Sequence, residues 1–218
     1  MDNFEFEKRI EETIWDIYPL DKILPIETVY SIFIEEYKKQ DNKSIYFKER
    51  KYQRMREGFF SIFVAISLKH NSVAEQYLIF PSNKSQDVLI GSPNKLNEKE
   101  LIVSPYDIKE FTIFSKSFFE FVDNVIKPKL GIYNLVIATH REINKEDFEY
   151  LIDLLKKEKS SAQVWLLGAP NEGEENLKAT KVTILNSEGI IYQKTFDLDD
   201  WLDFTKPIII YHDTLKLK

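Results

Sequence analysis

Two short segments of this chain place an acid, or an acid and a lysine, in apolar and strand-like surroundings. Asp87 opens the apolar run 88–90, and the triplet Asp107-Ile108-Lys109 lies within the mostly apolar stretch 102–114. Side chains at positions i and i+2 of a strand project from the same face, so Asp107 and Lys109 are expected to lie side by side. If the two segments pair as a hairpin, Asp87 converges with them. Two carboxylates and an ammonium at one point can hold a divalent metal and activate a water beside it.

The acid–x–lysine triplet alone discriminates little, because the sequence contains it four times. The other three, which begin at Glu36, Asp41 and Glu49, lie in helical or highly charged surroundings that are typical of solvated faces. By itself, the triplet at Asp107 is explained most simply as an exposed strand face with a salt bridge, which contributes little to stability. The acid on the preceding strand and the helices on either side favour a catalytic site instead.

The elements that must position these residues follow from periodicity and from proline and glycine breaks. A long helix from about Ser44 to Lys69 is polar in its first half and apolar on nearly all sides in its second half, so we expect it to be half exposed and half buried. The predicted N-terminal elements are helices over 4–18 and from Pro25, followed by strands over 76–80, 87–90 and 101–114. A helix over 115–130, a strand over 133–139 and a helix over 144–159 with Asn144 as its N-cap come next. The last predicted elements are strands over 164–168, 181–185, 190–196 and 208–211.

In motif and in element order, the chain resembles the PD-(D/E)xK nuclease superfamily from about Ser44 to Gly168. The resemblance implies an α/β fold with a restriction-endonuclease-like core in the order α-β-β-β-α-β. We expect a single domain over 1–218, in which a helical N-terminal extension (1–42) and a C-terminal extension with a β-hairpin (169–218) flank the nuclease-like core (43–168). The sequence departs from the family pattern in having Gln86, not proline, before the first acid, and aspartate instead of the commoner glutamate in the triplet.

The resemblance also implies roles for individual residues. Asp87 and Asp107 would be metal ligands together with the carbonyl of Ile108, and Lys109 would orient the attacking water or stabilise charge on the phosphate. The implied metal is Mg²⁺ (or Mn²⁺), a hard cation suited to carboxylate, carbonyl and water oxygens. Many members add a glutamate from the first core helix, for which Glu57 is the candidate. The alternative for Glu57 is an ion pair with Arg54 or a solvated position.

A basic segment precedes Glu57, with six cations within 14 residues of a chain whose net charge is −6. Interleaved aromatic residues could stack on unpaired bases, and we expect Lys48, Lys51 and Arg54 to contact phosphates. The alternative is an ordinary solvated helix face. Lys116 begins the helix after the triplet, where a helix N-terminus favours anions, and is a further candidate for phosphate contact. The alternative for Lys116 is that it is a lone lysine exposed to solvent.

Composition excludes several other chemistries. The chain has no cysteine, which excludes disulfides, thiolate zinc sites and iron–sulfur sites. It has no glycine-rich phosphate loop or dinucleotide fingerprint, and its three histidines lack metal-ligand spacing. His140-Arg141 follows the strand 133–139 at its carboxyl end, where ligands often bind in α/β sheets. No apolar run approaches the roughly 20 residues of a transmembrane helix, and no signal peptide is evident, so a cytoplasmic protein without membrane contact is expected.

The sequence is compatible with two functions. The first is a metal-dependent nuclease that hydrolyses DNA phosphodiester bonds, with DNA as its partner. The second is a non-catalytic nucleic-acid- or protein-binding protein on the same scaffold, in which the acids have no catalytic role. Because the net charge is −6, any DNA site must be a local basic patch on an acidic body. A homodimer is left open.

Overall fold

The computed structural model describes residues 18, 20–40, 49, 52–82, 86–112, 114–131, 134–168, 179–202 and 216–217. They belong to two compact units, of which unit 1 comprises Met1–Val103 and Asp203–Lys218 and unit 2 comprises Ser104–Leu202. The boundary falls within one long strand, β4 (Asn97–Phe111). The expected single domain with two extensions remains a prediction.

Unit 1 combines two helices with antiparallel strands. Helix α2 spans Ile26–Lys38 and helix α4 spans Gln53–Ser72. The strands lie in the order β1-β2-β3-β4, and the short strand β9 pairs with β4 in parallel at its edge. The β1–β2 and β2–β3 pairs are antiparallel. The bounds of these strands are Leu24–Pro25 for β1, Tyr77–Ile79 for β2, Val88–Asn94 for β3 and Lys216–Leu217 for β9.

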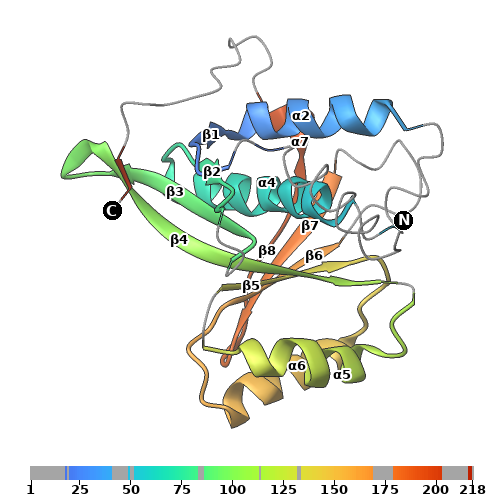
Figure 1. Cartoon of the computed structure of the whole chain (residues 1–218). Helices are drawn as coiled ribbons and strands as arrows, with labels where there is room; N and C mark the ends of the chain where they lie inside the picture. The colour runs from blue at the N-terminus through green and yellow to red at the C-terminus, as the bar shows by residue number, and fades with distance from the viewer. Residues whose placement is uncertain are drawn as a thin grey trace. The chain divides into compact units, whose positions relative to one another are not determined.

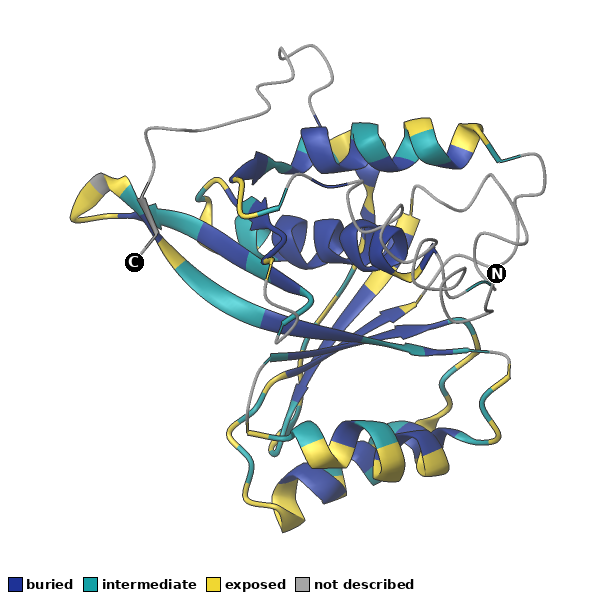
Figure 2. Cartoon of the chain, viewed as in Figure 1, coloured by how far each residue is buried: buried dark blue, intermediate teal, exposed yellow. Residues whose placement is uncertain are grey.

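Helix α4 is buried along most of its length (Figure 2). Its apolar second half packs on α2, where the Phe59 and Phe33 rings stack with their centroids 4.4 Å apart. The polar half was expected to be exposed, and for the described part of the helix that expectation is wrong. Arg54, Arg56 and Glu57 are each at most 5% exposed. The physical reason is that both guanidinium groups donate to backbone carbonyls inside the fold, which offsets part of the cost of burying them.

Gly58 allows a tyrosine ring to approach the helix closely. A Cβ at Gly58 would lie 2.5 Å from atoms of the Tyr18 ring and hydroxyl. Tyr18 is buried, stacks on Phe80 with a centroid separation of 4.2 Å, and donates its hydroxyl to the Met55 carbonyl at 3.1 Å. Burial raises the pKa of Tyr18, which keeps the hydroxyl protonated as the donor. The Tyr18 ring can therefore pack closely on α4 because Gly58 has no side chain.

Gly58→Ala is expected to lower the free energy of unfolding by about 1–3 kcal/mol, the usual cost of overpacking a filled core, although alanine is the better helix former. Urea denaturation of the two proteins measures the difference. Gly168→Ala is the matched control, because a Cβ there meets Lys181 at 3.7 Å, an ordinary contact distance. A Gly58→Ala protein as stable as the wild type would contradict the close packing of Tyr18 on α4.

Unit 2 has a parallel centre flanked by a β-hairpin. Its strand order is β4-β5-β6-β7-β8, in which β4, β5 and β6 run parallel and the last two pairs are antiparallel. Helices α5 and α6 cover one face of this part of the sheet (Figure 1). The bounds are Asn134–Thr139 for β5, Val164–Gly168 for β6, Ala179–Asn186 for β7, Gly189–Asp197 for β8, Phe118–Phe121 for α5, Lys145–Lys157 for α6 and Leu198–Trp201 for the short helix α7.

The core of unit 2 lies between these helices and the sheet. It includes Leu135 and Ile137 of β5, Phe121 of α5 and Leu151 of α6, all buried. Helix α6 begins with a capping box, in which Asn144 and Asp147 exchange side chain–backbone hydrogen bonds, as the predicted N-cap at Asn144 required.

The predicted helix over 115–130 is not one continuous α-helix. Helix α5 passes into a π-helical turn, η2 (Val122–Ile126), and then into a 3-10 turn, η3 (Lys127–Lys129). Pro128 explains the end of the helix, because it lacks a backbone donor and restricts the residue before it.

The mixed α/β class and the order of most predicted elements are confirmed. Asp107-Ile108-Lys109 lies in a strand, and the hairpin β7–β8 forms where the sequence predicted it. The restriction-endonuclease-like core remains a prediction, since β1, β7 and β8 lie beyond the strands that such a core needs. The predicted helix over 4–18 and the strand over 208–211 fall outside the described residues, apart from Tyr18.

Candidate active site

Asp107 and Lys109 lie side by side on β4, as their spacing predicted. The Lys109 ammonium donates to Oδ1 of Asp107 and, at 3.0 Å, to the carbonyl oxygen of Ile108. The Asp107 side chain is only 3% exposed, whereas that of Lys109 is 20% exposed. The Asp107 carboxylate and the Ile108 carbonyl are the two oxygen ligands that the resemblance implies for a metal. Both therefore contact the same cation, the Lys109 ammonium.

The strand register shows which face of the unit 2 sheet carries these groups. Asp107 is paired with Leu135 and Lys109 with Ile137 across the parallel β4–β5 ladder. Leu135 and Ile137 belong to the core beneath α5 and α6. Since paired residues of neighbouring strands project from the same face, Asp107 and Lys109 project towards the helical layer. The intervening Ile108 side chain projects from the opposite face.

Lys129 is a further member of this site that the sequence did not predict. Its ammonium donates to Oδ2 of Asp107, so each carboxylate oxygen accepts from a different lysine. Lys129 comes from the 3-10 turn η3, and 22 residues separate it from Asp107 in the chain. We call Asp107, Ile108, Lys109 and Lys129 the Asp107 cluster.

In unit 1, Arg54 bonds to the Glu57 side chain and to the backbone of Asp87. The Arg54 guanidinium donates to the Asp87 carbonyl at 2.5 Å and to the Pro81 carbonyl at 3.4 Å, and it lies 3.4 Å from the Glu57 carboxylate. Gln53 donates to the other Glu57 oxygen at 2.8 Å. Glu57 is thus ion-paired with Arg54, the alternative considered for it. Asp87 directly precedes β3, so the expected strand begins one residue later.

The expected metal ligands are divided between the two units. Glu57 and Asp87 belong to unit 1 and Asp107 to unit 2, so the convergence of all three stays a prediction.

The expected phosphate contacts have different outcomes. Lys48 and Lys51 lie outside the described residues. Arg54 is buried and bonded to two backbone carbonyls, which does not fit an exposed phosphate contact. Lys116 is 83% exposed and lies 3.4 Å from Glu120, one turn along, in a weak surface pair. Of the four candidates, Lys116 is the one whose described position suits contact with DNA.

The carboxylate and carbonyl oxygens of the Asp107 cluster fit the ligand preference of Mg²⁺. Mg²⁺ prefers hard oxygen ligands and is usually held by one or two carboxylates together with waters and substrate phosphates. The Asp107 carboxylate and the Ile108 carbonyl already meet at one cation, the Lys109 ammonium. Within the described part of the chain, no three His, Cys, Asp or Glu side chains form a group that could hold a metal.

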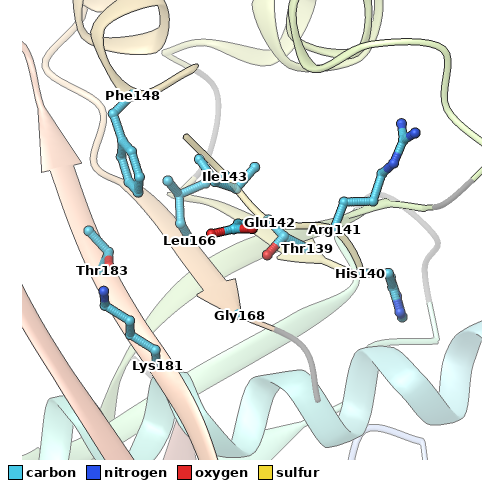
Figure 3. Close-up of a pocket in the computed structure, with 10 residues that line it drawn as sticks. All are labelled: Thr139, His140, Arg141, Glu142, Ile143, Phe148, Leu166, Gly168, Lys181 and Thr183. Atoms are coloured by element: carbon cyan, nitrogen blue, oxygen red, sulfur yellow. The ribbon is translucent and has the colours of Figure 1, made fainter. Parts of the chain in front are cut away.

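A pocket of about 560 Å³ lies at the carboxyl ends of β5 and β6 in unit 2, where the sequence singled out His140-Arg141. Figure 3 shows Arg141 and Lys181 on opposite sides of it, with Glu142 between them. Arg141 donates to the Ser115 carbonyl at 2.6 Å, which occupies part of its guanidinium. The walls mix both signs of charge with apolar side chains, so charge does not single out a class of ligand.

His140 forms a pair with a strand residue. Its Nε2 lies 3.0 Å from the Glu110 carboxylate, and the two side chains are 12% and 10% exposed. Glu110 follows Lys109 in β4 and projects from the opposite face of the sheet. The pair is therefore separate from the Asp107 cluster.

Comparison of the chain with models of protein families, with curated proteins and with solved structures finds no match. The described residues include no helix that combines the length and the hydrophobicity of a membrane-spanning segment.

Proposed function

We propose that this chain is a metal-dependent nuclease of the PD-(D/E)xK type that hydrolyses phosphodiester bonds in DNA. The observation that carries the proposal is the Asp107 cluster, in which a buried carboxylate, a backbone carbonyl and an ammonium group of strand β4 meet a second ammonium group from the turn η3. Carboxylate and carbonyl oxygens suit a hard metal, and ammonium groups suit a phosphate. One strand thus carries groups complementary to both the metal and the substrate.

In this mechanism, Asp107 and the Ile108 carbonyl would hold Mg²⁺ or Mn²⁺, with Asp87 and Glu57 as the further carboxylates that the sequence resemblance implies. When bound, the metal supplies Lewis acidity that neutralises phosphate charge and lowers the pKa of a water. The Lys109 ammonium orients that water or stabilises the charge that develops on the phosphate oxygens. Strand β4 fixes Asp107 relative to Lys109, because both side chains stand on one regular β ladder.

Incubation of supercoiled plasmid with the full chain tests the proposal. With Mg²⁺ or Mn²⁺ we expect nicking or linearisation, and with a chelator in excess we expect none. Single-stranded DNA and RNA are tested alongside, because the Asp107 cluster does not by itself distinguish the three. A folded protein that leaves all three substrates intact in the presence of either metal would refute the proposal.

Lys116→Ala is expected to weaken binding of duplex DNA and to flatten the log–log salt dependence of the binding constant by about one unit, the effect of one lost phosphate contact. Fluorescence anisotropy in a chelator measures binding without cleavage. Lys145→Ala is the matched control, since Lys145 is 88% exposed and lies 3.4 Å from Glu149 with the same spacing as the pair Lys116–Glu120. Equal slopes for the two variants would remove Lys116 from the DNA-binding surface.

The second candidate is a non-catalytic binding protein on the same scaffold. It is favoured by the observation that both carboxylate oxygens of Asp107 are occupied by ammonium groups, since such pairing also serves to neutralise a buried acid for structure alone. This candidate predicts DNA or protein binding that is insensitive to divalent metal. The plasmid assay separates the two candidates directly.

A further inference from the structure

We propose that Lys129 is a built-in counter-cation that competes with a divalent metal for Asp107 and thereby sets the metal affinity of the site. The proposal rests on the proposed nuclease function. Asp107 carries one negative charge and accepts from two ammonium groups, so the cluster is net positive without metal. A divalent cation that approaches Oδ2 of Asp107 must displace the Lys129 ammonium and is repelled by its charge.

The two lysines are not equivalent. Lys109 stands two residues from Asp107 on the same strand and also donates to the Ile108 carbonyl, so it has a second acceptor when Asp107 is otherwise engaged. Lys129 reaches Asp107 from a separate turn, and its side chain is 38% exposed. An ammonium that is partly in water is rehydrated readily, and the buried Asp107 carboxylate keeps a compensating charge because the divalent cation replaces the lysine. Lys129 is therefore the cation that yields when a metal binds.

The turn that carries Lys129 also supplies a control. Lys127 belongs to the same 3-10 turn, but its ammonium lies 3.6 Å from Glu158, not at the Asp107 cluster. The two lysines flank Pro128 and are similarly exposed, at 43% and 38%. Substitution of Lys127 therefore removes the same charge from the same turn without removing a bond to Asp107.

The test is the affinity of the full chain for Mn²⁺ without DNA, measured by titration calorimetry or from the paramagnetic resonance signal of free Mn²⁺. Lys129→Met is expected to bind Mn²⁺ about tenfold more tightly than the wild type, which corresponds to about 1.4 kcal/mol. Lys127→Met should leave the affinity unchanged, and Lys129→Arg should restore it to near the wild-type value. Asp107→Asn should weaken Mn²⁺ binding in both the wild-type and the Lys129→Met backgrounds, which shows that the measured site includes Asp107.

The outcomes separate this proposal from the nuclease proposal. If Lys129→Met binds Mn²⁺ at Asp107 no more tightly than the wild type does, the proposed competition between Lys129 and the metal is wrong. The nuclease proposal is unaffected by that result. No Mn²⁺ binding by either protein would overturn both. Lys129→Gln provides a second variant if Lys129→Met does not fold, as judged by circular dichroism. A merely structural role for Lys129 predicts unchanged or weaker metal binding, never tighter binding.

Discussion

Asp107→Asn is expected to slow metal-dependent DNA cleavage by at least about a hundredfold, the scale of losing one group that stabilises transition-state charge. Asparagine keeps the shape of the side chain but removes the charge that a divalent cation requires. Lys109→Met is expected to act similarly, because it removes the ammonium that meets both the Asp107 carboxylate and the Ile108 carbonyl. The rate of nicking of supercoiled plasmid with enzyme in excess measures both effects.

A loss of fold must be separated from a loss of chemistry in this experiment. Because the Asp107 side chain is only 3% exposed, its substitution is also expected to cost about 1–3 kcal/mol of stability, as for a buried polar group that loses its partners. Asp147→Asn is the matched control, since Asp147 is a buried acid of unit 2 that serves the capping box of α6. Cleavage that survives Asp107→Asn, or that fails equally in Asp147→Asn, would contradict the assigned role of Asp107.

Arg54→Met is expected to lower the free energy of unfolding by about 3–5 kcal/mol, because it removes the buried cation that pairs with the Glu57 carboxylate. The Arg54 and Glu57 side chains are 5% and 4% exposed, so water does not readily replace the lost partner. The substitution also removes the donor to the Asp87 and Pro81 carbonyls. Urea denaturation at one temperature measures the change.

The double variant Arg54→Met/Glu57→Leu tests the physical cause of that loss. If the cost arises from an uncompensated buried charge, removal of both partners should recover a large part of the stability. Lys156→Met is the control, because Lys156 and Asp153 form a pair of the same i, i+3 spacing on the surface of α6, with side chains 56% and 76% exposed. The single variants Arg54→Met and Glu57→Leu complete the comparison. If their losses of stability add up to that of the double variant, the two side chains do not form the buried ion pair.

Local patterns were sufficient to predict most of the elements that carry the candidate site. The apolar run around Asp107 predicted a strand, and the i, i+2 spacing placed Lys109 beside Asp107, because both signals depend only on neighbours in the chain. The same holds for the N-cap at Asn144, whose partner Asp147 is three residues away.

Long-range partners could not be predicted in this way. Lys129 reaches Asp107 from 22 residues along the chain, on a 3-10 turn that follows a π-helical turn. Arg54 had the sequence signature of an exposed basic face, yet it is buried by bonds to carbonyls 27 and 33 residues away. Backbone carbonyls have no residue type, so nothing in the sequence indicates such acceptors.

Anomalous diffraction from crystals of the full chain soaked in Mn²⁺ tests the central claim most directly. The proposed function predicts a peak bonded to the Asp107 carboxylate and the Ile108 carbonyl, with the Lys109 ammonium alongside and Asp87 as a further ligand. The proposed competition between Lys129 and the metal predicts in addition that the Lys129 ammonium has left Asp107. A crystal in which Asp107 remains bonded to Lys109 and Lys129 at a saturating Mn²⁺ concentration, with no metal peak at its carboxylate, would contradict the proposed metal-dependent nuclease.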